Sequence, residues 1–406
     1  MSWNSSTLGA LVERDGGLIQ TGPFGSQLHQ SDYVTDGIPV IMPKDITGGR
    51  VDSHSVARVS EETAARLSRH QLQPRTIVLP RRGEITKRAY IREEQTGWLC
   101  GTGCLQIVLD GGQVLPEFLY YYMEQQEVVR WLEQHAVGTT MLNLSATIVA
   151  ELPVRYPTLK SQERIADILS AYDDLIENNR RRMALLEDAA RQLYREWFVR
   201  LRFPGHEHTL ITNGVPEGWE RKKLADVADI NRESLSNKFD GEIEYIDIAS
   251  VTPGQINETT TYEFRDAPSR ARRVVRHGDI IWSCVRPNRR SHCVIWNPAP
   301  NLIASTGFAV ITPRELPTSY LYQAVTTDAF VGYLENHARG AAYPAVVAGD
   351  FERATIIVPT KSIVNTFNDF AEALLDQTHN LRMQNQRLRA ARDLLLPRLM
   401  NGEITV

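Results

Sequence analysis

Apolar residues recur at alternating spacings of four and three along the stretch from Ile165 to Trp197. The positions are Ile165, Leu169, Tyr172, Ile176, Asn179, Met183, Leu186, Ala190, Leu193 and Trp197, and only Asn179 is polar. A narrow stripe sustained over about five heptads is typical of a coiled coil, whereas a single helix packed on a globular core usually carries a wider apolar face. One polar residue in such a stripe is of the type that fixes register. The pattern predicts a long helix that pairs with another.

A second stretch near the C-terminus carries a related stripe. Apolar residues recur every seven positions at Phe367, Leu374, Leu381, Leu388 and Leu395, while the alternate positions, Ala371, Thr378, Asn385 and Arg392, are more polar. Asn385 follows Asn179 by the same offset as Pro359 follows Pro153. Packing the two helices together would bury both stripes. The polar alternate positions indicate that the second helix also faces water or a partner protein.

The rest of the chain contains the same order of motifs twice, about 200 residues apart, which indicates duplicated domains and not a solenoid. Four markers keep their order, each in a first and a second copy: Gly101–Val108 and Ser305–Ile311, Phe118–Tyr122 and Tyr320–Tyr322, His135–Thr140 and His337–Ala342, Leu152–Val154 and Val358–Thr360. Strands are expected at 76–79, 105–109, 279–282 and 308–311, and short helices within 116–133 and 318–336. We therefore expect an α+β fold: two similar domains, each followed by a long helix, with the helices antiparallel and related by pseudo-twofold symmetry.

The expected segments are a first domain (1–157), a central helix (158–200), a linker (201–218), a second domain (219–360) and a distal helix with the tail (361–406). A helix of about 35 residues would span roughly 50 Å, and one turn of B-DNA is about 34–36 Å. The helix pair could therefore hold two small domains at two segments of one duplex.

Composition excludes several classes of protein. The chain is 42% hydrophobic and 23% charged, with no apolar run long enough to span a membrane and no signal-peptide pattern at its start. We therefore expect a cytoplasmic protein without a membrane partner. The four cysteines fit neither a disulfide framework nor zinc spacing, so we expect no metal site. The net charge of −4 conceals one strongly basic cluster between Arg270 and Arg290 and a smaller one around Arg81.

Five motifs resemble, in the right order, the specificity subunit of Type I restriction-modification systems. They are Leu18–Leu28 with Asp32, Tyr33 and 37–41; Arg82–Glu84; Gln162–Leu169 with 176–179 and 193–198; Pro216–Trp219; and Arg392–Ile404. The second domain departs from the pattern, with Asn231–Leu235 in place of a Gly-Pro-Phe-Gly loop and Arg286–Asn288 in place of Arg-Gly-Glu. Divergence is expected if each domain reads a different sequence.

The resemblance implies a non-catalytic subunit that recognises a split double-stranded DNA site. It implies two adenine-N6 methyltransferase subunits as partners, with endonuclease and translocase subunits as optional further partners. The chain itself is expected to bind no cofactor, and the partners would use S-adenosylmethionine, ATP and Mg²⁺. Partner contacts and spacer function are expected at Ile165, Leu169, Tyr172, Ile176, Asn179, Leu186, Leu374, Leu381, Asn385 and Leu388.

The DNA-contacting candidates are arginines, small polar residues and glycine-containing loops. Arginine offers a bidentate fork to guanine, and asparagine pairs similarly with adenine. Backbone N–H groups in a glycine-rich loop can approach a phosphate, although the same loop can be an ordinary turn. In the first domain we select Thr21, Gly22, Phe24, Ser26, Arg81, Arg82, Lys87, Gly138, Thr139 and Thr140. In the second we select Arg270, Arg272, Arg273, Arg286, Asn288, Arg289, Arg290, Thr306, Arg339 and Tyr343.

Three other functions are compatible with the same sequence features. The chain could be a standalone DNA-binding regulator, an enzyme with a divergent site, or a coiled-coil adaptor. It carries no Gly-x-x-x-x-Gly-Lys-Ser/Thr loop, and Asn297–Pro300 lacks the adjacent prolines and the aromatic residue of an amino-methyltransferase motif. An adaptor role would leave the arginine clusters unexplained. Activity of the purified chain with S-adenosylmethionine or Mg²⁺ would reveal an enzyme.

Overall fold

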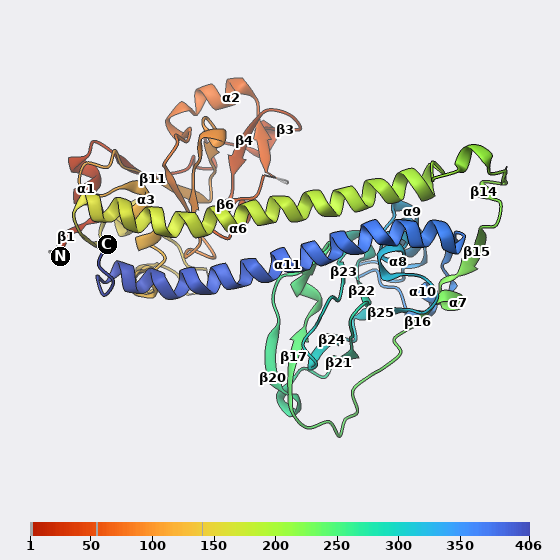
Figure 1. The fold of residues 1–406 in the computed structure, drawn as a ribbon. Coiled ribbons are helices and arrows are strands. Elements are labelled where there is room, and N and C mark those ends of the chain that lie inside the picture. The colour runs from red at the N-terminus through yellow and green to blue at the C-terminus, as the bar shows by residue number, and fades with distance from the viewer. Residues whose placement is uncertain (1–2, 54–55, 140) are drawn as a thin grey trace. The chain divides into compact units, whose positions relative to one another are not determined.

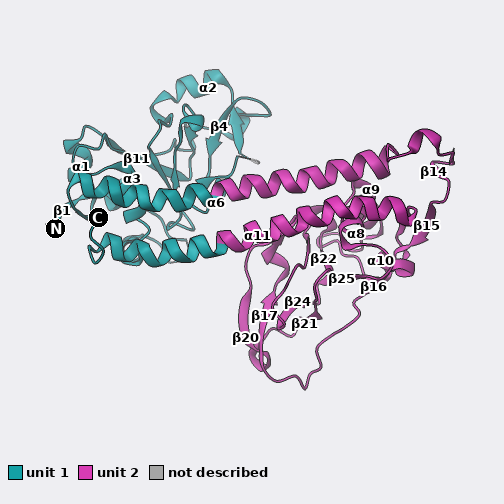
Figure 2. Ribbon diagram, in the orientation of Figure 1, with its two compact units in different colours: residues 1–176, 386–406 teal, residues 177–385 magenta. Residues whose placement is uncertain are grey.

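The computed structural model describes residues 3–53, 56–139 and 141–406 (Figure 1). These residues form two compact units, residues 1–176 with 386–406 and residues 177–385, coloured separately in Figure 2. Each unit contains one α+β domain and one half of each of two long helices. The compact units divide both helices internally, so the five segment bounds expected from the sequence stay predictions.

The first domain has two four-stranded sheets among its described residues, with strand orders β10-β4-β7-β3 and β2-β11-β8-β9. β4 and β10 pair in parallel, and the other neighbours in these sheets pair antiparallel. The remaining paired strands of this domain are the antiparallel pair β1–β12 and the hairpin β5–β6. The strands are β1 (Asn4–Thr7), β2 (Leu18–Thr21), β3 (Tyr33–Val34), β4 (Ile38–Ile41), β5 (Ile46–Thr47), β6 (Arg50–Val51), β7 (Ala57–Val59), β8 (Ile77–Pro80), β9 (Ala89–Tyr90), β10 (Leu99–Cys100), β11 (Cys104–Val108) and β12 (Pro153–Tyr156).

Short helices cover this domain, and local chemistry sets where they begin. Thr7, Ser60 and Ser145 each accept a backbone N–H at a helix N-cap. Pro116 occupies the first turn of its helix, where its fixed φ is already helical. The helices are α1 (Leu8–Arg14), α2 (Glu61–Arg66), α3 (Pro116–Tyr122), α4 (Gln126–His135) and α5 (Ala146–Ala150), with 3₁₀ turns η1 (Gln30–Asp32), η2 (Pro43–Asp45), η3 (Ser68–His70) and η4 (Glu93–Gln95).

The second domain repeats this plan with sheets β16-β25-β22-β23 and β20-β17-β24-β21, the pair β15–β26 and the hairpins β13–β14 and β18–β19. Its strands are β13 (Ile211–Thr212), β14 (Val215–Pro216), β15 (Glu220–Lys223), β16 (Ala228–Ile230), β17 (Glu242–Ile246), β18 (Val251–Thr252), β19 (Gln255–Ile256), β20 (Thr260–Glu263), β21 (Ala271–Val274), β22 (Ile280–Ser283), β23 (His292–Val294), β24 (Leu302–Ser305), β25 (Phe308–Pro313) and β26 (Thr355–Val358). Its helices are α7 (Leu224–Val227), α8 (Thr318–Ala324), α9 (Asp328–His337) and α10 (Ala348–Arg353), with 3₁₀ turns η6 (His206–His208), η7 (Ile248–Ser250), η8 (Phe264–Asp266) and η9 (Pro287–Arg289).

The two domains share one topology, which confirms the duplication expected from the repeat. β11 lies between β2 and β8 as β25 lies between β16 and β22. The parallel pair β4–β10 has its counterpart in β17–β24. All four residues of β8 and of β22 are buried, as expected for strands covered on both faces. The strands and short helices expected from the sequence are present, with α3 and α4, like α8 and α9, separated by a short break.

The long helices are α6 (Leu159–Tyr194), followed by the π-helical turn η5 (Arg195–Val199), and α11 (Lys361–Met400). In the first unit, Ile165 and Leu169 of α6 share a buried cluster with Leu396 and Leu399 of α11. In the second unit the ring of Tyr194 lies 6.1 Å from that of Phe367. The start of α6 therefore contacts the end of α11, and the end of α6 contacts its start. These contacts confirm the antiparallel pairing.

The pairing differs from a simple coiled coil in one respect. In the last turns of α11 the buried residues are Leu396, Leu399 and Met400, whereas Leu395 is only partly buried. The stripe shifts because the helices pack simultaneously on each other and on the domain cores, where α6 and α11 residues join the same clusters as α3 and α8. The helix pair is therefore part of both cores.

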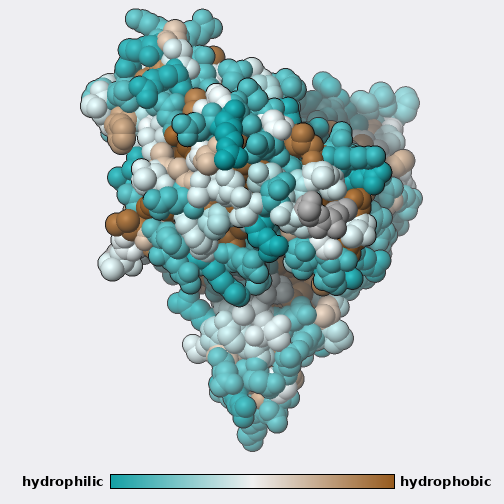
Figure 3. All heavy atoms as spheres, turned by 90° about the vertical axis from the view of Figure 1, so that its left-hand side faces the viewer, coloured by the Kyte–Doolittle hydropathy of each residue, from teal (hydrophilic) through white to brown (hydrophobic). Residues whose placement is uncertain are grey.

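No helix within residues 3–53, 56–139 and 141–406 is long and apolar enough to cross a membrane. On the face drawn in Figure 3, hydrophobic side chains lie scattered among hydrophilic ones.

Candidate nucleic-acid interface

In the first domain, two loops that lie far apart in the sequence meet at the end of β8. The N–H of Leu144 donates to the carbonyl of Arg81 at 2.8 Å, and the N–H of Gly83 donates to that of Leu142 at 3.2 Å. These two backbone hydrogen bonds join the segment 81–87 to the described part of the segment 137–144. We call this pair of segments the first loop pair. It brings together the basic cluster and the Gly138 turn that were selected separately from the sequence.

The glycine-containing loop after β2 joins the same region through one side chain. The Arg81 guanidinium lies over the ring of Phe24, 5.7 Å from its centroid, and Phe24 is 57% exposed. The Arg81 Nε is buried without an acceptor among the described residues. Arg81 therefore lies beside an exposed aromatic ring with its Nε buried.

Gly22 serves this loop differently from what the sequence suggested. It is buried, its N–H donates to the carbonyl of Cys104 at 2.9 Å, and an added Cβ would lie 1.9 Å from the carbonyl oxygen of Gly101. Gly22 therefore permits close backbone packing and its N–H is already used inside the fold, while its contact with DNA stays a prediction. Ser26 is exposed and Thr21 lies half-buried in β2, so they stay predictions.

The remaining first-domain candidates are at the surface of the loop pair. Arg82 is exposed, and Lys87 forms an ion pair with Glu84 at 2.6 Å. Gly138 and Thr139 are exposed, while Thr140 lies outside the described residues. Val137 and Met141, which the sequence selection omitted, expose 68% and 61% of their surface.

The second domain builds an equivalent arrangement, the second loop pair, from residues 284–290 and 339–346. The N–H of Val346 donates to the carbonyl of Cys284 at 2.9 Å, and the N–H of Arg286 donates to that of Pro344 at 2.7 Å. These bonds match those of the first domain, so Arg286 occupies the position of Gly83. Burial raises the pKa of the Cys284 thiol to about 11 while the Arg273 guanidinium opposes that shift, which places Arg273 near this loop.

Two arginines bound the η9 turn with unusual backbone angles. Arg286 has φ +51° and Arg290 has φ +54°, in the left-handed region that ordinary side chains rarely adopt. Gly83 reaches φ +77° without that strain. Strain of this kind tends to persist where a side chain must be presented at a particular place. Within the turn, Asn288 and Arg289 are exposed.

Arg286 and Tyr343 form the most defined contact of the second loop pair. The guanidinium lies 4.6 Å from the ring centroid, and its Nη2 also donates to the carbonyl of Ala342 at 3.3 Å. Tyr343 nevertheless exposes 69% of its surface. Arg339 is exposed on the same loop and pairs through its backbone with Ala345. These residues present cations and an aromatic face together.

The other basic candidates differ in whether their side chains are engaged by contacts within the fold or exposed. Arg272 lies 4.5 Å over the ring of Phe264, Arg273 donates to Ser234 at 3.1 Å, and Arg290 pairs with Asp328 at 2.5 Å. Arg270 and Thr306 are exposed neighbours, joined by a backbone hydrogen bond of 2.8 Å. Arg272, Arg273 and Arg290 are thus engaged by contacts within the fold, whereas Arg270 is exposed beside Thr306.

The helix residues selected as partner contacts lie mostly inside the structure. Ile165, Leu169, Ile176, Asn179, Leu381 and Asn385 are buried, and Tyr172, Leu186, Leu374 and Leu388 are half-buried. The buried ones pack inside the structure, and the expected roles of all ten as partner contacts and spacer residues stay predictions. Leu175 and Leu394 in the first unit, and Leu185 and Phe370 in the second, are large apolar residues exposed on the same helices.

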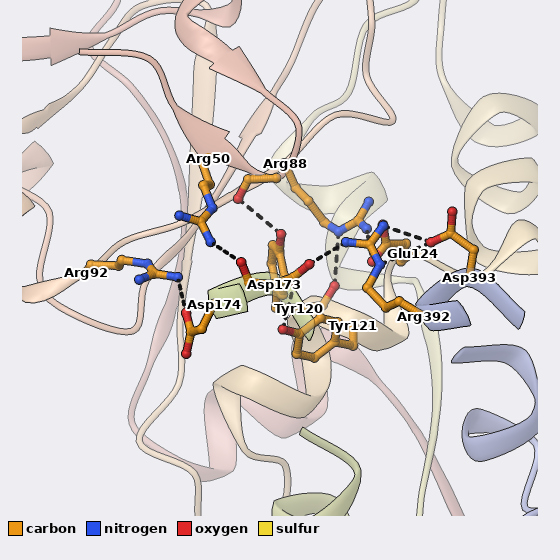
Figure 4. Close-up of polar contacts among 11 residues, drawn as sticks. Arg50, Arg88, Arg92, Tyr120, Tyr121, Glu124, Asp173, Asp174, Arg392 and Asp393 are labelled. Atoms are coloured by element: carbon orange, nitrogen blue, oxygen red, sulfur yellow. Dashed lines mark hydrogen bonds and ion pairs between the residues drawn. The ribbon is translucent and has the colours of Figure 1, made fainter. Parts of the chain in front are cut away.

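A polar network joins the first domain to its helix segments (Figure 4). Asp173 of α6 accepts from the Tyr121 hydroxyl at 2.9 Å and from Arg392 of α11 at 2.5 Å. Arg392 and the buried Arg88 both pair with Glu124, at 3.4 and 3.0 Å. Burial raises the pKa of Tyr121, and the Asp173 carboxylate raises it further, so this phenol stays a donor. The network fixes how the first domain sits on the two helices of its unit.

Aromatic rings take the larger part in joining the second domain to its helix segments. The rings of Tyr194, Phe198, Tyr320 and Phe367 cluster with their centroids 4.8 to 6.3 Å apart. Polar contacts to α11 accompany them: Trp296 donates to Asp376 at 2.8 Å, Ser319 donates to Asn368 at 2.6 Å, and Arg382 of α11 donates to the carbonyl of Gly254 at 3.0 Å. The second domain is thus held on its helices mainly by aromatic packing.

Within the described residues, no group of three or more His, Cys, Asp or Glu side chains is placed to hold a metal ion. The four cysteines are free thiols.

Comparison with known proteins identifies relatives along nearly the whole chain. A family model described as "Type I restriction modification DNA specificity domain" matches residues 3–188 and 216–384. The MjaIX specificity subunit of a Type I restriction enzyme from Methanocaldococcus jannaschii is 25% identical, with 92% of this chain and 88% of that protein covered. The HindI specificity subunit from Haemophilus influenzae is 22% identical, covering 78% and 83%. The crystal structure of the S subunit from M. genitalium has a TM-score of 0.57 at 16% identity, with 98% and 96% covered.

Proposed function

The chain belongs to the Type I restriction modification DNA specificity family, and we propose on this basis that each of its domains reads one half of a split DNA site. In this role the chain performs no chemistry itself. It directs an adenine-N6 methyltransferase, and an endonuclease where one is present, to the sequence that it recognises.

The observation that carries the proposal is the presence of two equivalent loop pairs. Each domain joins the segment after β8 or β22 to a glycine-containing turn by matching backbone hydrogen bonds. Each presents an arginine next to an exposed aromatic side chain. Arginine and asparagine side chains can read base edges, while further arginines contact phosphates. We assign Arg286, Asn288 and Arg289 to base edges and Arg270 to the backbone.

The helix pair supplies the spacer in this proposal. It is built from α6 and α11, of 36 and 40 residues. Two equivalent domains on equivalent helices offer two similar docking faces, which suits two copies of one methyltransferase subunit. S-adenosylmethionine, ATP and Mg²⁺ would be used by the partner subunits.

Methylation-site mapping tests the proposal. Genomic DNA from cells that carry this chain with its methyltransferase should contain N6-methyladenine in a split motif. In cells that lack only this chain, methylation at that motif should be lost. Unchanged methylation would contradict the proposal and favour the alternative of a standalone DNA-binding regulator, which would then bind its own site without a methyltransferase.

A further inference from the structure

Met141 and Tyr343 occupy the same place in the two loop pairs. Each is the fourth residue of a turn that begins with a glycine, Gly138 in the first domain and Gly340 in the second. Met141 is 61% exposed and Tyr343 is 69% exposed. A single exposed apolar residue is ordinary on a protein surface. Two large apolar side chains at one position of a duplicated loop, in domains of divergent sequence, are less easily explained by chance.

The glycine that begins each segment has a positive φ and lies close to the backbone of the residue three positions later. Gly138 has φ +118°, and an added Cβ would lie 2.4 Å from the carbonyl oxygen of Met141. Gly340 has φ +99°, and a Cβ there would lie 3.1 Å from the carbonyl oxygen of Tyr343. A side chain would block this approach at Gly138 and would be crowded at Gly340, and the positive φ favours glycine at both positions.

The base of each turn is closed by two backbone hydrogen bonds. Val137 and Asn143 exchange bonds of 3.0 and 2.9 Å, and Arg339 and Ala345 exchange bonds of 2.8 and 2.9 Å. Met141 and Tyr343 therefore lie in segments whose ends are joined by paired backbone hydrogen bonds.

The arginines around the two turns indicate which ligand Met141 and Tyr343 would contact. Arg286 lies 4.6 Å from the Tyr343 ring, and Arg339 is exposed at the base of the same turn. In the first domain, exposed Arg82 pairs through its backbone with Asn143. An apolar tip flanked by guanidinium groups complements a ligand with an anionic exterior and an apolar, stacked interior, which describes double-stranded DNA.

We propose that Met141 and Tyr343 are equivalent wedge residues that press against the base stack of DNA, one in each half-site. The inference rests on the proposed function and adds a role beyond base reading. Methyltransferases must take their target base out of the stack. A wedge that loosens a neighbouring base step would make that extrusion easier.

The experiment uses the full chain with its methyltransferase and duplexes carrying 2-aminopurine, which fluoresces more strongly when unstacked, at steps beside each half-site. The variants are Met141→Ala and Tyr343→Ala. Tyr343→Phe keeps the ring, and Leu210→Ala removes an apolar residue that is 68% exposed in another part of the second unit.

We expect wild type to raise the fluorescence in both halves. Each alanine variant should lose the rise in its own half only and bind about 10-fold more weakly. Tyr343→Phe and Leu210→Ala should behave as wild type. Binding by wild type without a fluorescence rise, or alanine variants that keep it, would overturn the wedge alone. If wild type bound no split site, the proposed function would fail together with the wedge.

Discussion

Asn179 and Asn385 hold the same position in the two copies of the repeat, and the Asn179 Nδ2 donates to the Asn385 Oδ1 at 3.0 Å. Both side chains are buried, at 7% and 4% exposure. Equivalent residues touch where a twofold axis relates two helices, so this contact marks the pseudo-twofold axis of the antiparallel helix pair. A buried polar pair of this kind fixes register at a cost in stability.

Replacing one member of this pair should destabilise the chain. Asn179→Leu leaves Asn385 buried with one partner fewer and should lower the free energy of unfolding by about 1–3 kcal/mol. The double variant with Asn385→Leu should recover that loss, because no polar group is left opposite leucine. Urea unfolding measures both. A double variant less stable than the single one would contradict this explanation.

The polar network of the first unit should be sensitive to the loss of Arg392. Arg392→Met leaves Asp173 and Glu124 without that cation, and both are largely buried. We expect the free energy of unfolding to fall by about 3 kcal/mol. Asp393→Asn removes an exposed partner of the same arginine, at 61% side-chain exposure, and should change it by less than about 0.5 kcal/mol. Equal effects of the two variants would show that the network does not stabilise the unit.

His292 should make the second domain sensitive to acid. Burial, with the positive charges of Arg290 and Arg191, lowers its pKa to about 4. In the unfolded chain His292 becomes protonated below about pH 6.5, whereas in the folded chain it stays neutral until the pH approaches 4. Because protonation then stabilises only the unfolded chain, the free energy of unfolding is highest above about pH 6.5 and falls as the pH is lowered toward 4. The loss should amount to about 3 kcal/mol. His292→Gln should flatten this part of the profile, and an unchanged slope would refute the assignment.

The variant Arg286→Gly should affect the stability of the chain and its affinity for DNA differently. Glycine adopts φ +51° without strain, as Gly83 does at its own positive φ in the first domain, and this gain offsets the lost contacts with Tyr343 and Ala342, so stability should change by less than about 1 kcal/mol. Affinity for the half-site of the second domain should nevertheless fall about 10-fold, because the guanidinium is gone. Thermal unfolding and a binding titration at fixed salt measure the two effects. Unchanged affinity would exclude Arg286 from the interface.

The sequence predicted the fold well because the periodic and repeated features are physical constraints on it. The Asn179 stripe predicted the paired helix, and the repeat predicted the shared topology. The site was harder to predict, because loop pairs form between segments such as 81–87 and 137–144 that no local pattern connects. Gly22 was selected as part of a ligand loop, and the structure shows its N–H bonded inside the fold. Met141 was missed, although its alignment with Tyr343 in the repeat was a usable signal.

The most direct test of the central claim is to map N6-methyladenine in cells carrying the wild-type chain or a chain in which Arg286, Asn288 and Arg289 are replaced by alanine. We predict a split motif for wild type and a change confined to one half of it in the variant. A continuous motif, or a variant that alters both halves alike, would contradict the claim that each domain reads its own half-site.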